Sequence, residues 1–159
     1  MEKDRFEIRK LGAATMTSPL PLSNREGDKL FNFVSDADRV VFKTAIKDFT
    51  KCLQSGDAPL SVEKAGPREK IFFDPRKTTA AIVTCGGLCP GINNVIRSLV
   101  MGLYYFYGVK KIIGIPYGYQ GLSPDNPHSY YDLTPEKVRD IHQFGGTMLG
   151  SSRGGQQVT

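Results

Sequence analysis

A short apolar run at 79–84, rich in β-branched residues, most constrains what this chain can fold into. Such a run is typical of a strand that is covered on both faces in a parallel sheet. The glycine-rich segment 85–91 that follows is predicted to be a turn. Apolar residues then recur at helical spacing until Gly108, which predicts an amphipathic helix of about four turns. The apolar positions of this helix are Ile92, Val95, Ile96, Leu99, Val100, Leu103, Tyr104 and Tyr107.

The segment 111–115 is a second candidate for a buried strand. Strand, turn, helix and strand together make one βαβ unit, so we expect a parallel α/β sheet. The segment 116–132 contains four tyrosines among glycines and prolines, and it is predicted to be a long loop. Loops of this length in compact domains are usually functional.

The last part of the chain carries a clear helix start. Thr134 is the expected N-cap and Pro135 the first helical residue of a short helix that ends at 145–146. We expect a brief strand at 147–149. A second turn of small residues follows at 150–155.

The N-terminal third has a different character. Residues 1–34 mix charged residues with prolines and show no sustained period, which indicates an extended arm or loop. Ser35 and Asp38 resemble a capping box, and the apolar spacing after them predicts a helix at 36–54. We therefore divide the chain into an N-terminal extension with one helix, 1–67, and the first part of a larger domain, 68–159.

Composition excludes several classes of protein. The chain has 159 residues, enough for one domain with a hydrophobic core, and no apolar run of the length that a membrane span needs. Residues 1–10 are charged, where a secretory signal would be apolar, so we expect a cytoplasmic protein with reduced cysteines. The net charge of +5 is spread along the chain, which argues against a nucleic-acid partner. No second Cys/His pair accompanies Cys85 and Cys89, so no metal site is predicted.

The glycine-rich turn between strand and helix could bind a phosphate, because the first amides of a helix lack partners. The alternative is that the glycines only allow a tight turn. Arg153 follows the second glycine-rich turn, and the carboxyl ends of parallel strands line one crevice, so both turns could face one ligand. The alternative for Arg153 is an exposed surface side chain.

Three segments together resemble the phosphofructokinase family. They are 84–93 (TCGGLCPGIN), 118–122 (GYQGL) and 145–154 (GGTMLGSSRG), and they occur in the family's order and spacing. The resemblance covers about residues 65–157 and implies a Rossmann-like parallel-sheet domain. The cysteines and the N-terminal extension are similar to the ATP-dependent branch found in plants, trypanosomatids and some bacteria.

The resemblance also implies the site and the reaction. Gly86 and Gly87 would contact the nucleotide, Tyr119 would lie near the adenosine, and Arg153 with Gly154 would contact the ATP phosphates. Arg153 would also be catalytic, because its charge stabilises the phosphoryl group in transfer. The reaction would be transfer of the terminal phosphoryl group of ATP to fructose 6-phosphate, with Mg²⁺, in glycolysis by a homotetramer without nucleic-acid or membrane partners. His128 and His142 match no catalytic position of the family.

The family motifs that supply the magnesium ligand and the catalytic base do not occur in these 159 residues. We therefore expect a fragment that is inactive alone, with the metal ligand beyond Thr159. Two alternatives stay open: a pyrophosphate-dependent phosphofructokinase, because the motif that separates the donors is absent, and a non-catalytic fragment that associates with a complete subunit.

Overall fold

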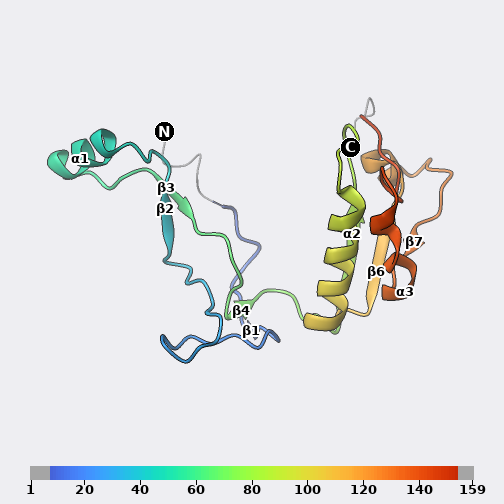
Figure 1. Cartoon of the computed structure of the whole chain (residues 1–159), viewed down its shortest axis with the longest axis horizontal. Coiled ribbons are helices and arrows are strands. Elements are labelled where there is room, and N and C mark those ends of the chain that lie inside the picture. The colour runs from blue at the N-terminus through green and yellow to red at the C-terminus, as the bar shows by residue number, and fades with distance from the viewer. Residues whose placement is uncertain (1–7, 154–159) are drawn as a thin grey trace. The chain divides into compact units, whose positions relative to one another are not determined.

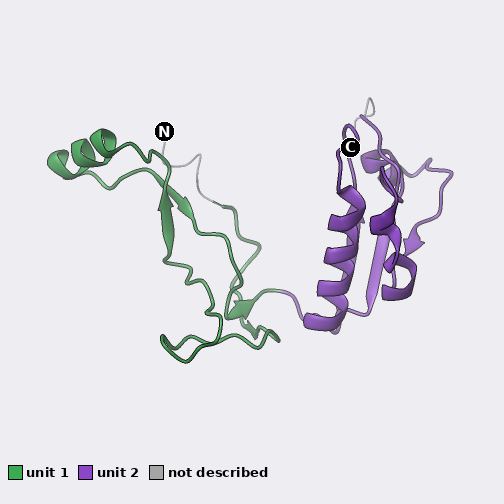
Figure 2. Cartoon of the chain, in the orientation of Figure 1, with its two compact units in different colours: residues 1–72 green, residues 73–159 purple. Residues whose placement is uncertain are grey.

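The computed structural model describes residues 8–153 and divides into two compact units, Met1–Phe72 and Phe73–Thr159 (Figure 2). Each unit is described by itself. In the first unit the strands are β1 (Met16–Thr17), β2 (Arg39–Val41), β3 (Ser61–Glu63) and β4 (Lys70–Ile71), and the helix is α1 (Ile46–Ser55). In the second unit the strands are β5 (Thr79–Val83), β6 (Lys111–Ile115) and β7 (Tyr131–Asp132), and the helices are α2 (Ile92–Met101) and α3 (Pro135–Val138).

The second unit contains a three-stranded sheet in the order β5-β6-β7, of which β6 and β7 are labelled in Figure 1. β5 and β6 are parallel, with Thr79 opposite Lys111 and Val83 opposite Ile115, so the predicted βαβ unit is confirmed. β7 is antiparallel to β6, which makes the sheet mixed, whereas the sequence predicted only parallel strands. The unit is an α/β structure. Its buried core consists of Ile82, Ile96, Val100, Val109, Ile112, Leu133, Val138 and Leu149.

Helix α2 follows the glycine-rich turn, as predicted. Gly91 ends that turn in the left-handed conformation, with φ 87°, and the helix continues into a single π-helical turn, Gly102–Phe106. The apolar face expected for this helix is only partly buried: the side chains of Val95 and Leu99 are 58% and 47% exposed. The buried stripe is Asn93, Ile96 and Val100.

The strand expected at 147–149 is wrong. The backbone N–H of Met148 donates to the Asn93 side chain, and the N–H of Leu149 donates to the Thr147 hydroxyl, so these amides are not available to a strand ladder. The Leu149 side chain is buried over Gly114 of β6, where a side chain at 114 would collide with it. The segment is therefore a turn that packs on the sheet without extending it.

The cap predicted at Thr134 is confirmed. Its hydroxyl accepts the N–H of Lys137 at 3.4 Å, and Pro135 occupies the first helical position. The pKa of the Glu136 carboxyl is lowered below its ordinary value. The larger cause is a hydrogen bond from the backbone N–H of Glu136 itself, and the next is a hydrogen bond with the Thr134 side chain. The helix is shorter than expected, since α3 ends at Val138 and a separate 3₁₀ turn covers Ile141–Gln143.

The segment 116–132 is not a featureless loop. A 3₁₀ turn covers Gly118–Leu122, and β7 forms near the end of the segment. Gly121 is buried in this turn, and a Cβ at this position would lie 2.7 Å from Cγ2 of Ile115 and would collide with the carbonyl oxygen of Pro116. The close approach explains why a glycine stands here.

The single helix predicted at 36–54 of the first unit is wrong over 36–45, whereas its second half is confirmed by α1. The N–H of Ser35 donates to the Asp38 carboxylate and the N–H of Asp38 donates to the Ser35 carbonyl, which closes a turn where a helix start was expected. β2 follows this turn and pairs with β3 in antiparallel register. The two valines of β2 favour a strand because their side chains are β-branched. The helix α1 therefore begins only at Ile46, and Gly56 caps it with φ 74°.

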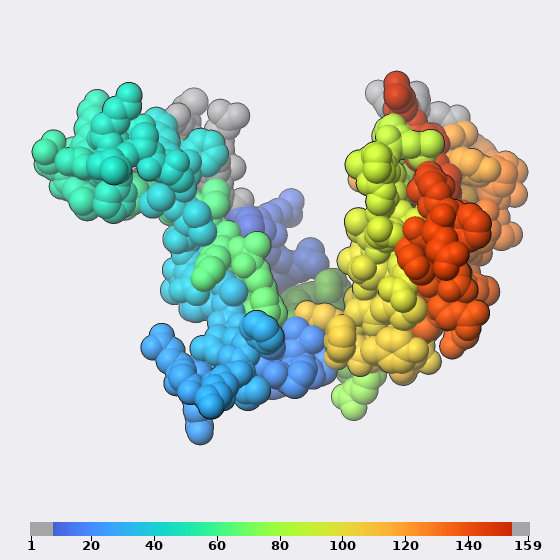
Figure 3. Space-filling view, in the orientation of Figure 1, coloured from blue at the N-terminus to red at the C-terminus, as the bar shows by residue number. Residues whose placement is uncertain are grey.

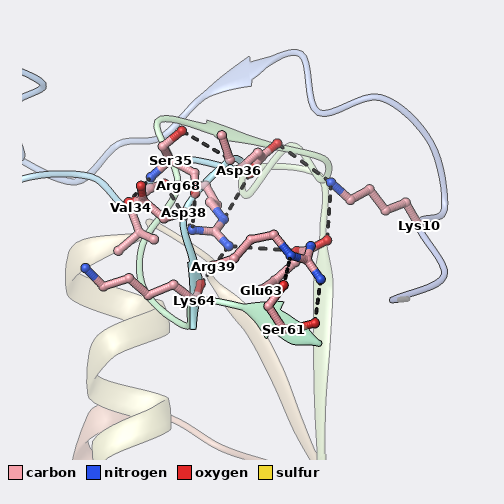
Figure 4. A network of polar contacts seen from close by, with 11 residues as sticks. Lys10, Val34, Ser35, Asp36, Asp38, Arg39, Ser61, Glu63, Lys64 and Arg68 are labelled. Carbon is pink, nitrogen blue, oxygen red and sulfur yellow. Dashed lines mark hydrogen bonds and ion pairs between the residues drawn. The ribbon is translucent and has the colours of Figure 1, made fainter. Parts of the chain in front are cut away.

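A polar network centred on Arg68 joins distant parts of the first unit (Figure 4). The Arg68 guanidinium donates to the carbonyl oxygens of Val34 at 3.0 Å and Lys64 at 2.8 Å. It also forms ion pairs with Asp36 at 3.0 Å and Glu63 at 3.9 Å.

No described helix of the chain is both long enough and apolar enough to cross a membrane.

We expect Arg68→Met to destabilise the first unit by about 2–3 kcal/mol, because carbonyl groups that now receive charge-assisted hydrogen bonds lose their donor. Arg76→Met is the matched control: the Arg76 side chain is 82% exposed and pairs only with its neighbour Asp74 in the described contacts. Such exposed pairs contribute little, so we expect a change below about 0.5 kcal/mol. Urea unfolding measures both changes, with hydrogen exchange of residues 34–68 for Arg68→Met in the first unit and of residues 73–83 for Arg76→Met in the second. Equal effects of the two variants would contradict the role of the network.

Candidate functional site

A pocket of about 510 Å³ lies within the second unit. Residues of both glycine-rich segments, 86–88 and 145–153, form its walls. Five of its nine lining residues are glycines, so much of its surface is bare backbone. The lining residues are Gly86, Gly87, Leu88, Gly145, Gly146, Thr147, Gly150, Ser151 and Arg153.

Hydrogen bonds join the turn after β5 to the turn at 150–153. The N–H of Gly86 donates to the carbonyl of Ser152 at 3.1 Å, and the Ser151 hydroxyl donates to the carbonyl of Gly86. Gly86 has φ 86°, a conformation that side chains rarely adopt. The two turns are therefore held together as one structure.

The Arg153 guanidinium lies beside Gly87. A Cβ added to Gly87 would be 3.3 Å from Nη2 of Arg153, so any side chain at 87 would compete with the arginine for space. Among the pocket-lining residues Arg153 carries a positive charge, and its side chain is exposed to solvent. A guanidinium next to backbone amides that no side chain covers favours binding of an anionic ligand, because both groups donate hydrogen bonds to negatively charged oxygens.

Two further hydroxyl groups belong to this region. The Thr84 hydroxyl, directly after β5, donates to the Gly150 carbonyl at 2.7 Å and lies 3.0 Å from Oγ1 of Thr147. The Ser152 hydroxyl is buried and has no hydrogen-bond partner within residues 8–153. Sequence reasoning missed both. A short polar side chain at the carboxyl end of a buried strand was the available signal for Thr84.

An unusual backbone conformation follows β6. Tyr117 has φ 56°, in the left-handed region, and its N–H donates to the carbonyl of Leu149 at 2.9 Å. Its ring packs over Gly150 and lies 4.7 Å from the His128 ring, measured between centroids. Tyr117 thus contacts the second glycine-rich turn through both its ring and its backbone N–H.

The structure brings together three of the five residues predicted from the resemblance: Gly86, Gly87 and Arg153 all line the pocket. Tyr119 does not line it and is 58% exposed. Gly154 lies outside the described residues. The amides at the start of α2 were expected to hold the phosphate, but the lining comes from the preceding turn and not from Ile92 or Asn93.

The described residues do not fit a metal site. Within 8–153 no group of three or more His, Cys, Asp or Glu side chains could hold a metal ion. Cys85 and Cys89 flank the first turn as exposed free thiols. The chemistry available in this pocket is therefore anion binding by an arginine, hydroxyl groups and backbone amides.

Comparison with known proteins relates these features to a family. The family model described as Phosphofructokinase matches residues 79–159. An ATP-dependent 6-phosphofructokinase of Borreliella burgdorferi is 46% identical over 153 residues, which cover 94% of this chain and 33% of the relative. One from Amycolatopsis methanolica is 48% identical over 158 residues, covering 98% of this chain and 34% of the relative.

A third relative, an ATP-dependent 6-phosphofructokinase of Entamoeba histolytica, is 60% identical over 95 residues, which cover 60% of this chain and 22% of the relative. The first two relatives match nearly all of this chain. The chain thus spans about a third of the length of these curated relatives. The family model covers the sheet, α2 and both glycine-rich turns, which are the elements that build the pocket. The chain belongs to the phosphofructokinase family.

Proposed function

We propose that this chain supplies the nucleotide-phosphate pocket of an ATP-dependent 6-phosphofructokinase. The whole enzyme would transfer the terminal phosphoryl group of ATP to fructose 6-phosphate, giving fructose 1,6-bisphosphate in glycolysis. The observation that carries the proposal is the position of Arg153 beside Gly87, where two glycine-rich turns meet in one pocket. The relatives are ATP-dependent 6-phosphofructokinases, which favours ATP over pyrophosphate as the donor.

The pocket fits the phosphates of ATP. Because Gly87 has no side chain, a phosphate oxygen can approach the backbone there, in the space that Arg153 borders. The guanidinium can form two parallel hydrogen bonds to phosphate oxygens. ATP would supply the transferred phosphoryl group, and Arg153 would stabilise the charge on its oxygens during transfer.

Magnesium is part of the proposal for the whole enzyme but not for the described residues. We place its ligands, the catalytic base and the sugar-phosphate site beyond Thr159, because the family motifs that supply the magnesium ligand and the base do not occur in these 159 residues. Assembly as a homotetramer is proposed on the family resemblance, and sedimentation of the complete gene product tests it.

We place the enzyme in the cytoplasm, the compartment of glycolysis in most cells. One relative from Arabidopsis thaliana, 53% identical over 98 residues, is named chloroplastic, so a second compartment is the alternative. Cell fractionation with an antibody against this chain distinguishes the two.

The purified chain of 159 residues is expected to show no turnover with ATP, Mg²⁺ and fructose 6-phosphate, and at most weak nucleotide binding. Positioning the phosphates is only one requirement, since transfer also needs a metal, a base and an acceptor site. A coupled assay measures turnover, and the complete gene product is the positive control. The same preparation with Arg153→Ala reveals activity from a contaminating host enzyme. Turnover that the chain shows and Arg153→Ala abolishes would contradict the expectation, and a complete gene product without turnover would overturn the proposed function.

A further inference from the structure

The side chain of Asn93 is buried in the first turn of α2 and uses both ends of its amide. Its Oδ1 accepts the N–H of Met148 at 2.8 Å, and its Nδ2 donates to the carbonyl of Phe144 at 3.0 Å. The residue is only 4% exposed. A buried amide with both groups paired is costly to disturb, because any group left without a partner loses a hydrogen bond that water cannot replace.

These two bonds hold the ends of one short segment, 144–148. The residues between the ends are Gly145, Gly146 and Thr147, which line the pocket. Two of them are glycines and have no side chain to anchor the segment, and the Phe144 side chain is 68% exposed. Met148 packs against the core at one end of the segment, while the two glycines depend on the hydrogen bonds of the residues that flank them.

The other wall, 86–88, is covalently continuous with α2. Gly86, Gly87 and Leu88 lie in the turn that leads directly into the helix. In Figure 3 the residues of α2 and those around 140–150 lie side by side on the surface, in agreement with the packing of α2 against the 3₁₀ turn Ile141–Gln143. Asn93 thus links the helix that carries one wall to the segment that forms the other.

We propose that Asn93 is a positioning residue that sets the separation of the two glycine-rich walls and so determines nucleotide affinity. This inference rests on the proposed function, because it requires that the pocket hold nucleotide phosphates. Asn93 does not line the pocket and acts only through the segment 144–148. Loss of its amide lets Gly145 and Gly146 move away from Gly87, and small misplacements in such sites have large effects.

The variants Asn93→Ala and Asn93→Leu test the proposal in the complete gene product, with Asn94→Ala as the matched control. Asn94 is the next residue of the same helix and is exposed. Leucine has the same number of side-chain heavy atoms and the same branching as asparagine, and it continues the apolar stripe of Ile96 and Val100, so it fills the space that Asn93→Ala would leave empty. Calorimetric titration with ADP gives the dissociation constant, and coupled assays give KM for ATP and for fructose 6-phosphate.

We expect both Asn93 variants to weaken ADP binding and to raise KM for ATP about tenfold, with KM for fructose 6-phosphate within about twofold of wild type. Amide exchange at 144–148 should accelerate in the same variants. Asn94→Ala should match wild type in every measurement. A merely structural residue would lower the melting temperature and affect both substrates alike.

The proposal is overturned if a folded Asn93 variant binds ADP within about twofold of wild type, if both KM values rise together, or if neither variant folds. Wild type that binds no ADP overturns it as well. Wild type that binds ADP without phosphofructokinase turnover refutes the proposed function alone, and the ADP titrations of the variants then still decide the role of Asn93.

Discussion

Arg153→Ala is expected to lower kcat of the complete enzyme by about 10²- to 10³-fold, with a small change in KM for ATP. The Arg153 guanidinium lies beside Gly87 and lines the pocket between the two glycine-rich segments. Its hydrogen bonds should strengthen as the phosphoryl group leaves ATP, so removing them affects the transition state more than the bound substrate. Steady-state kinetics with varied ATP measures the effect.

Two further variants show what Arg153 contributes. Arg153→Lys keeps the charge but loses the planar pair of donors, so we expect an intermediate kcat. Arg76→Ala removes an exposed arginine of the same unit that pairs with Asp74 outside the pocket, and it should match wild type. A wild-type kcat for Arg153→Ala with a raised KM would show instead that Arg153 binds ATP equally in the ground and transition states.

The central part of the fold could be predicted from the sequence because its pattern is local. β5 is a short β-branched run, and glycines end it at the turn. α2 follows with helical spacing, and β6 pairs with β5 in parallel as expected. Each of these elements is specified by residues within itself, so tertiary context had little to override.

The errors occurred where side chains compete for backbone hydrogen bonds. The amides of Met148 and Leu149 donate to the side chains of Asn93 and Thr147, so residues 147–149 form no strand. Ser35 and Asp38 form reciprocal bonds that close a turn, although the same pair of residue types also starts helices. Short polar side chains permit both outcomes, and the sequence alone does not decide between them.

The site was predictable where the residue type carries the chemistry. Gly86, Gly87 and Arg153 line one pocket, while their part in binding ATP stays a prediction. Asn93 was missed, although one signal existed: it is a polar residue three positions before Ile96 on the buried stripe of α2. A polar residue on an apolar stripe needs partners from another segment, and spacing cannot identify those partners.

The packing around the 3₁₀ turn gives the largest expected effect on stability. Gly121→Ala should destabilise the second unit by about 3 kcal/mol or more, because the new Cβ would collide with the Pro116 carbonyl oxygen and lie 2.7 Å from Cγ2 of Ile115. The φ of Gly121 is not in the left-handed region, so the cost arises from space alone. Urea unfolding of the purified chain, followed by hydrogen exchange of residues 111–122, measures the change.

Gly102→Ala is the control for Gly121→Ala, since it adds the same methyl group where there is room. Gly102 has helical dihedral angles, φ −63° and ψ −49°, and the nearest atom to a new Cβ is a ring carbon of Phe106 at 4.0 Å. Alanine restricts the unfolded chain more than glycine does, so we expect no loss of stability or a gain of about 0.5–1 kcal/mol. If Gly121→Ala and Gly102→Ala had the same free energy of unfolding, the turn after β6 would have space for a methyl group, contrary to the contacts of Gly121 in the structure. Loss of stability in Gly121→Ala alone would establish that this turn is closely packed on β6. Tyr117, which follows β6 and contacts the second glycine-rich turn, depends on the same packing.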